Sequence, residues 1–173
     1  PHSRSLAAVI NSGLKSIKIL YICTHNRCRS ILSEAITDTL AGDVITARSA
    51  GSQPSDEVHP LSLKYLDKAG YRTAGLTSKS WDDVENFQPD IVITVCHSAA
   101  GEACPLYFGD SVKFYWGLED PSKLKVSESE QEQAFRACIE EIEQRVQILK
   151  IIIEQNHNNS DLRDALLALE AAK

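Results

Sequence analysis

The chain has 173 residues, of which 43% are hydrophobic and 24% are charged, and its formal net charge is −6. These values indicate one globular domain with some excess at an end, and they exclude a disordered chain and a generally basic nucleic-acid binder. No apolar run reaches the roughly 20 residues that span a bilayer. The apolar cluster at residues 6–10 is also shorter than a signal-peptide core of about 7 to 15 residues. We therefore expect a cytoplasmic protein that binds neither membranes nor nucleic acids.

The chain contains five cysteines, which are Cys23, Cys28, Cys96, Cys104 and Cys138. In a reducing compartment an odd number is more typical of reactive or buried thiols than of a disulfide framework. The first four could form a four-sulfur zinc site, but their spacing lacks the tight knuckles that such sites favour. The sequence therefore favours thiol chemistry, and it predicts neither a metal nor another cofactor.

Strand-like and helix-like segments alternate along the chain. Strands are expected where apolar or β-branched residues form short runs, and helices where apolar residues recur at intervals of three and four. The expected elements, in chain order, are a strand at 17–22, a helix at 30–40, a strand at 44–47, a helix at 59–69, a helical turn at 80–86, strands at 91–95 and 112–116, and helices at 127–154 and 161–172. This alternation predicts an α/β fold with a four-stranded parallel sheet flanked by helices.

The same pattern divides the chain into three parts. We expect residues 17–155 to form the domain, with an irregular N-terminal arm at 1–16 and a C-terminal tail at 156–173. The long helix at 127–154 is the most clearly amphipathic element. Its apolar stripe consists of Phe135, Ile139, Ile142, Val146, Leu149 and Ile153.

The segment CTHNRCRS, residues 23–30, joins the first buried strand to the first helix. Backbone N–H groups of such a loop, with the N-terminus of the next helix, form a nest for a tetrahedral oxyanion. Arg29 can grip two oxyanion oxygens at once, and a cysteine in this field is expected to be a thiolate. We therefore expect Cys23 to be a nucleophile and Asn26 to pin the unusual backbone turn. The expected oxyanion-binding residues are Thr24, His25, Asn26, Arg27, Cys28, Arg29 and Ser30.

At these residues the sequence resembles a known family. A Cys-x5-Arg-Ser loop after the first strand, with Asp120-Pro121 far downstream, is similar to the low-molecular-weight protein tyrosine phosphatases. The segments CTHNRCRS, RSAG, VHP, TSKSWDD, VITVC, ACP and WGLEDPS more closely resemble the arsenate reductases built on that fold. The resemblance covers residues 17 to about 150. It implies the phosphatase-like fold and an arsenate substrate, with phosphate and sulfate as oxyanion analogues. His25 and Arg27 depart from it, because glycine and a small residue are more usual there.

A second pair of cysteines separates a reductase from a phosphatase. Cys96 comes directly after the strand at 91–95, so it lies on the same sheet edge as Cys23, where ligands bind in open α/β folds. Cys104 lies further along, in a loop of small residues. In the reductases one cysteine forms an arsenic adduct, a second attacks the first, and a third resolves the disulfide. The resemblance implies these roles for Cys23, Cys96 and Cys104, and two incidental buried cysteines are the alternative.

Asp120 matches the general acid of the family, which protonates the departing oxygen. An aspartate before proline is also an ordinary turn residue, and Glu119 is a less favoured neighbour for the role. Cys28 is interpreted as loop packing or as an auxiliary thiol. Cys138 lies beside the apolar stripe of the long helix and is interpreted as core.

Together these features predict reduction of arsenate to arsenite for arsenic detoxification, with an external thiol reductant that restores the cysteines. The pair Cys96 and Cys104 favours thioredoxin, and glutathione with glutaredoxin is the alternative. Two other functions stay open. One is a phosphatase that acts on phosphotyrosine or small phosphoesters, and the other is a binding module that senses arsenic through its thiols. A general acid argues against the binding module, since a sensor does not need one.

Overall fold

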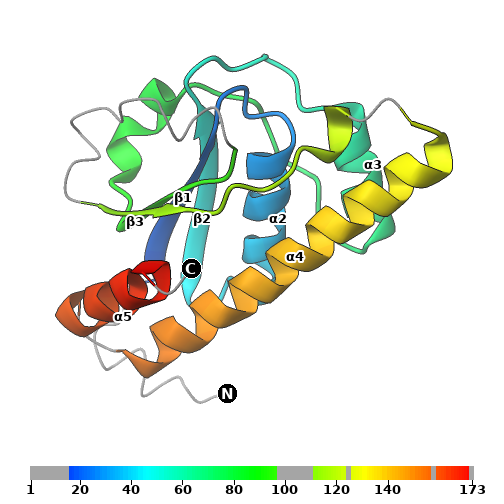
Figure 1. Cartoon of the computed structure of the whole chain (residues 1–173). Helices are drawn as coiled ribbons and strands as arrows, with labels where there is room; N and C mark the ends of the chain where they lie inside the picture. Colours follow the sequence, from blue (N-terminus) through cyan, green and yellow to red (C-terminus); the bar gives the residue numbers. More distant parts are fainter. Residues whose placement is uncertain (1–15, 97–110, 124–125, 157–158, 172–173) are drawn as a thin grey trace.

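The computed structural model describes residues 16–96, 111–123, 126–156 and 159–171 (Figure 1). Its centre is a four-stranded sheet with the order β2-β1-β3-β4, in which each strand runs parallel to its neighbours. The strands are β1 (Ile17–Cys23), β2 (Ile45–Gly51), β3 (Ile91–Thr94) and β4 (Val112–Tyr115). The predicted parallel α/β architecture is confirmed.

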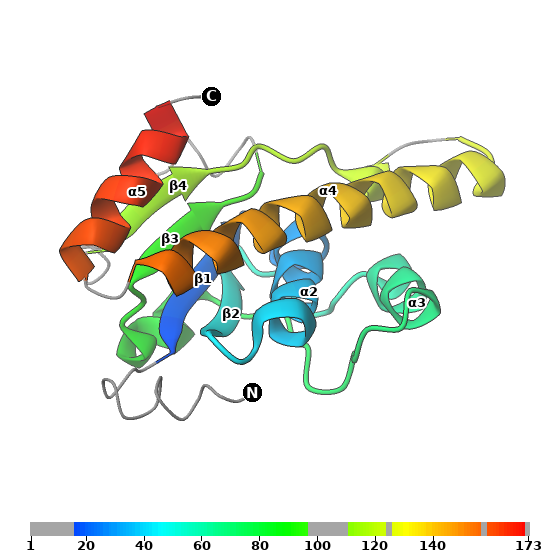
Figure 2. The ribbon, with the colours of Figure 1, turned by 90° about the horizontal axis from the view of Figure 1, so that it is seen from below.

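Helices cover the sheet, and α2 and α4 lie side by side against it in both views (Figures 1 and 2). The helices are α2 (Arg29–Ala41), α3 (Pro60–Lys68), α4 (Glu128–Gln155) and α5 (Asn159–Ala171), and the short 3₁₀ segments are η1 (Trp81–Phe87) and η4 (Pro121–Lys123). The apolar stripe predicted for the long helix is buried along α4, from Phe135 to Ile153. None of the helices in these described ranges combines the length and apolar character that a membrane crossing requires.

The strand register brings the carboxyl ends of β1, β2 and β3 to one edge of the sheet. Cys23 lies opposite Gly51 in β2, and Ile22 lies opposite Thr94 in β3. Residues 19–22 of β1 are almost fully buried, because the strand is central in the sheet and both of its faces are covered. Cys96 lies two residues beyond the end of β3, so Cys23 and Cys96 lie at the same edge of the sheet.

The strand β2 is longer than its sequence predicts. The polar residues Arg48 and Ser49 interrupt the apolar run, and the expected strand therefore ends at residue 47. In the structure the parallel ladder with β1 continues through Arg48 and Ser49 to Gly51. Pairing with the buried strand β1 overrides the low strand preference of these polar residues. Ser49 is buried there, and its hydroxyl donates to Glu34 Oε1 at 2.5 Å.

The last helix packs on the same core as the sheet. Leu162 and Leu166 of α5 are buried with the sheet residues, and α5 contacts both β4 and α4. Residues 1–15 of the arm predicted at 1–16 lie outside the described residues, and the division of the chain into arm, domain and tail stays a prediction.

Adjacent leucines on α5 test whether this helix contributes to the core. Leu166 is fully buried and Leu167 is 47% exposed. We expect Leu166→Ala to lower the free energy of unfolding by about 2 to 5 kcal/mol, because it leaves a cavity. The control Leu167→Ala should change it by no more than about 0.5 kcal/mol. Urea denaturation measures both, and equal small losses would show that α5 does not stabilise the fold.

Candidate active site

The loop between β1 and α2 has its carbonyl groups bound from outside. The Thr24 carbonyl accepts a hydrogen bond from Gln53 N at 2.8 Å, and the Arg27 carbonyl accepts one from His59 N at 3.0 Å. The His25 carbonyl is also bound by neighbouring segments. These carbonyls therefore point away from the interior of the loop. The interior is left to backbone N–H groups, which are the donors that an oxyanion needs.

Asn26 holds the turn in this loop. It is fully buried with a φ of 48°, a left-handed conformation that asparagine tolerates better than most residues. Its Nδ2 donates to Ser30 Oγ at 2.8 Å, and its Oδ1 accepts from Lys79 N at 2.9 Å. The end of β2 packs closely against the backbone of the loop. A Cβ on Gly51 would lie 2.5 Å from the Thr24 carbonyl oxygen, so only glycine fits there.

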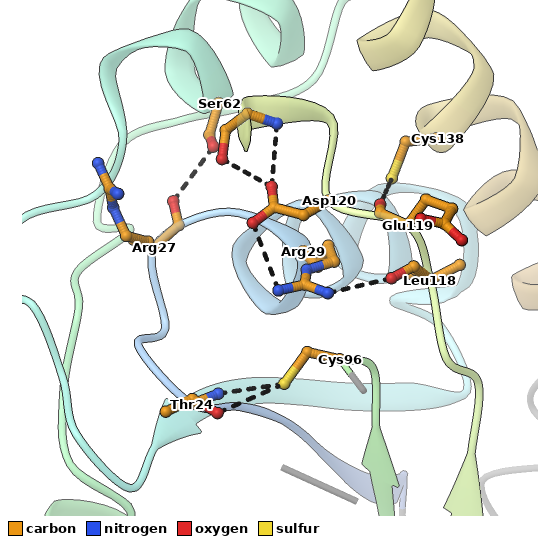
Figure 3. Close-up of polar contacts among 10 residues, drawn as sticks. Thr24, Arg27, Arg29, Ser62, Cys96, Leu118, Glu119, Asp120 and Cys138 are labelled. Carbon is orange, nitrogen blue, oxygen red and sulfur yellow. Dashed lines mark hydrogen bonds and ion pairs between the residues drawn. The ribbon is translucent and has the colours of Figure 1, made fainter. Parts of the chain in front are cut away.

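Arg29 and Asp120 face each other across the open side of the loop (Figure 3). Arg29 Nη2 lies 3.4 Å from Asp120 Oδ2, and Arg29 Nη1 donates to the Leu118 carbonyl at 3.1 Å. The two charged side chains are only 11% and 14% exposed. Arg29 Nε is buried and has no hydrogen-bond partner within the part of the chain that the structure describes. The guanidinium therefore keeps a donor for a further acceptor, as an oxyanion site at this position requires.

The other oxygen of Asp120 is bound by the next turn of the chain. Asp120 Oδ1 accepts from Ser122 N at 2.9 Å and from Ser122 Oγ at 2.6 Å. The neighbouring Glu119 presents its backbone carbonyl to the Cys138 thiol, with 4.0 Å between sulfur and oxygen. Of the two acidic residues, Asp120 is thus the one whose carboxyl group meets Arg29.

The sulfur of Cys96 lies against the loop that carries Cys23 (Figure 3). Thr24 N donates to Cys96 Sγ at 3.3 Å, and Thr24 Oγ1 lies 3.7 Å from the same sulfur. Cys96 also makes a hydrogen bond with Cys23. The structure therefore brings together Cys23, Arg29, Asp120 and Cys96, whereas Cys104 lies outside the described residues. The roles assigned to these residues stay predictions.

Contact between the two sulfurs changes the ionisation of Cys23. Its pKa is raised, first by the hydrogen bond with Cys96, then by burial and by the charge that Cys96 can carry. Arg29 and the backbone N–H of His25 act in the opposite direction. The sequence predicts a Cys23 thiolate because it takes into account only the positive charge and the N–H groups of the loop. In the resting pair Cys96 outweighs that influence, because two hydrogen-bonded acids hold their second proton tightly.

Cys28 and Cys138 are buried thiols at neutral pH. Burial raises the pKa of Cys28 to about 12, although hydrogen bonds with Ser62 and Ser122 lower it. Burial also raises the pKa of Cys138 well above its usual range. Since the thiolate is the reactive form, neither residue is placed to act as a nucleophile in this state.

His25 and Arg27, the two residues that depart from the family pattern, lie on the outer side of the loop between β1 and α2. His25 Nδ1 is 3.0 Å from the Gln53 carbonyl oxygen. The Arg27 side chain points away from Arg29 and Asp120 in Figure 3. The pKa of His59 is lowered, first by burial and then by the charge of Arg27, and Asp120 opposes this shift. No three or more His, Cys, Asp or Glu side chains of the described ranges are grouped to hold a metal ion.

Sequence reasoning missed Ser62 and Ser122. The Ser62 hydroxyl donates to the Arg27 carbonyl at 3.1 Å and so ties the start of α3 to the loop. No local pattern could reveal this long-range contact. The sequence does indicate the contact of Ser122, because the side chain of an aspartate in a turn often accepts a hydrogen bond from the residue two positions later.

Comparison with known proteins agrees with this geometry. Residues 18–159 match the model of the low molecular weight phosphotyrosine protein phosphatase family. The chain belongs to this family. It is 30% identical to an arsenate reductase of Halalkalibacterium halodurans over 128 residues, which cover 74% of this chain and 91% of that protein. It is 29% identical to a glutaredoxin arsenate reductase of Synechocystis over 135 residues, which cover 76% of this chain and 95% of that one.

A solved structure supports the same placement. A thioredoxin-dependent arsenate reductase of Corynebacterium glutamicum superposes with a TM-score of 0.64 and 29% sequence identity. The superposition covers 86% of this chain and 68% of that one. Within the phosphatase family, these relatives are named for reductase activity.

Removing Cys96 should make Cys23 more acidic. Because the hydrogen bond with Cys96 is the largest influence that raises the pKa of Cys23, Cys96→Ala should move the pH midpoint of Cys23 alkylation down by about one unit or more. Alkylation of Cys23 by iodoacetamide at pH 7 should therefore be faster, as measured by peptide mass spectrometry. The control Cys138→Ala removes a buried thiol elsewhere. An unchanged or slower reaction in Cys96→Ala would contradict the sulfur–sulfur contact.

Proposed function

We propose that this protein reduces arsenate to arsenite through a relay of Cys23, Cys96 and Cys104, which an external thiol protein regenerates. One observation carries the proposal. The sulfur of Cys96 lies within hydrogen-bond contact of Cys23 and 3.3 Å from the Thr24 N–H of the oxyanion loop. A phosphatase needs no second thiol at that position. The relatives named as arsenate reductases support the substrate.

In the first step Cys23 passes its proton to an oxygen of the dianionic arsenate held by the loop N–H groups and Arg29, and the resulting thiolate attacks the arsenic atom. A sulfur–arsenic bond forms, an arsenic–oxygen bond breaks, and Asp120 supplies the proton with which the oxygen leaves as water. The guanidinium and the N–H groups stabilise the charge that develops on the remaining oxygens.

In the second step the Cys96 thiolate attacks the Cys23 sulfur. A disulfide forms, the sulfur–arsenic bond breaks, and its electron pair stays on arsenic, which leaves as arsenite. Two cysteines are thereby oxidised while arsenic is reduced. Cys104 then attacks Cys96 and releases Cys23, and the Cys96–Cys104 disulfide is reduced from outside by thiol–disulfide exchange.

Thioredoxin is the reductant that we propose. A paired disulfide suits a dithiol partner, and the relative from Corynebacterium glutamicum is named as thioredoxin-dependent. The glutaredoxin arsenate reductase of Synechocystis makes glutathione with glutaredoxin the second candidate. A relay of free thiols requires a compartment that keeps cysteines reduced, so we place the protein in the cytoplasm.

A phosphatase is the second candidate function, because Cys23, Arg29 and Asp120 are the parts that phosphoester cleavage needs. Arsenate and phosphate share charge and shape, so one loop binds both. The fate of the covalent adduct on Cys23 decides between the two functions. Water completes a phosphatase cycle, whereas release of arsenite needs a second thiol.

Asp120→Asn should keep oxyanion binding and slow the first covalent step by about 100-fold or more, because it removes the proton donor. Phosphate binding by calorimetry and single-turnover adduct formation measure the two effects separately. If binding is lost while the rate of the step persists, Asp120 is a structural turn residue.

Cys96→Ser and Cys104→Ser should each stop multiple-turnover arsenate reduction and leave cleavage of an aryl phosphate largely intact. Without Cys96 the arsenic adduct should persist on Cys23, and without Cys104 a Cys23–Cys96 disulfide should accumulate. Mass spectrometry of non-reduced peptides detects both species. Cys138→Ser is the matched control. If both variants reduce arsenate like the parent, the relay is wrong and the phosphatase becomes the better interpretation.

A further inference from the structure

The two carboxyl oxygens of Asp120 have different surroundings. Oδ1 accepts two hydrogen bonds from Ser122, one from its backbone N–H at 2.9 Å and one from its hydroxyl at 2.6 Å. Oδ2 lies 3.4 Å from Arg29 Nη2. Charge-assisted bonds between nitrogen and carboxylate oxygen are usually about 2.7 to 2.9 Å long, so this contact is a loose one.

This asymmetry determines where a proton can sit. An oxygen that already accepts an N–H and an O–H has no free direction for a proton of its own, so the acid form of Asp120 carries its proton on Oδ2. Oδ2 is also the oxygen on the side of Arg29, where the guanidinium keeps its Nε for an incoming oxyanion. When an oxyanion engages Arg29, Oδ2 faces one of its oxygens, so a proton carried on Oδ2 lies within reach of that oxygen.

The other groups around Asp120 do not replace Ser122. The titratable and charged groups that face it are Arg29 of α2, His59 at the start of α3, Cys28 of the loop and Cys138 of α4. Of these, Arg29 contacts Oδ2, whereas both hydrogen bonds to Oδ1 come from Ser122.

We propose that Ser122 is the positioning residue that reserves Oδ2 of Asp120 for the catalytic proton and aims it at the leaving oxygen. This rests on the proposed role of Asp120 as general acid, which arsenate reduction and phosphoester cleavage share. Ser122 does not touch the substrate. It acts through Asp120.

The test compares leaving groups, because a poor leaving group needs the proton and a good one does not. In Ser122→Ala, cleavage of phenyl phosphate should slow by about 10-fold or more. Cleavage of 2,4-dinitrophenyl phosphate should stay within about 3-fold of the parent, since dinitrophenolate leaves without a proton. Ser122→Thr keeps the hydroxyl and should restore both rates. The control Ser127→Ala removes the serine that caps α4 and should leave the ratio of the two rates unchanged.

The outcomes separate this inference from the proposed function. Equal losses for both esters in Ser122→Ala, or no rescue by Ser122→Thr, would overturn the positioning role even if the parent reduces arsenate. A parent that cleaves both esters without reducing arsenate would overturn the reductase and leave the positioning role in place. If the parent cleaves neither ester, single-turnover formation of the arsenic adduct on Cys23 replaces the esters, and an unchanged rate in Ser122→Ala would then overturn the positioning role.

Discussion

The chemistry at this site depends on the orientation of one short loop. Its N–H groups face inward because neighbouring segments donate hydrogen bonds to its carbonyl groups and because Asn26 accepts a left-handed conformation. The segment after β2 and the start of α3 supply those donors, through Gln53 and His59 among others. The loop is therefore preorganised before any oxyanion arrives. Such donors cost no reorganisation at the moment of reaction, which is the main advantage of a fixed anion site.

The parallel sheet adds the second requirement, a thiol beside the nucleophile. The strands β1 and β3 are neighbours, and each has a cysteine at or just beyond its carboxyl end, on the same edge of the sheet. The contact through which Cys96 would attack Cys23 in the proposed relay also makes the protons of the two thiols interdependent. In the proposed relay, nucleophile activation and disulfide formation are therefore coupled through one contact, which a phosphatase with a single cysteine lacks.

Much of this arrangement could be predicted from the sequence, because it is local. The run of apolar residues in β1, the spacing Cys-x5-Arg-Ser and the stripe of α4 are properties of continuous segments. The later residues of β2 could not be predicted, since Ser49 is polar and the partner of its buried hydroxyl, Glu34, lies on α2. The protonation of Cys23 was also beyond the sequence. A pattern shows that Arg29 is near Cys23, but it does not show that the Cys96 sulfur makes contact and reverses the balance.

The role of Ser122 could be predicted from the sequence only in part. The Asp-Pro-Ser turn is visible in the sequence, and it favours a hydrogen bond from Ser122 to the Asp120 carboxylate. The division of the two Asp120 oxygens between Ser122 and Arg29 requires the fold, because Arg29 is distant from both in the chain.

The most direct measurement of the central claim uses the fully reduced parent chain, mixed with arsenate in the absence of any external thiol. If the electrons come from the protein's own cysteines, about one arsenite should form per chain and about two free thiols should disappear. Arsenite is quantified by chromatography with mass detection, and thiols are quantified by alkylation. No arsenite and no thiol loss, in a preparation that still cleaves an aryl phosphate, would contradict the reductase and leave a phosphatase.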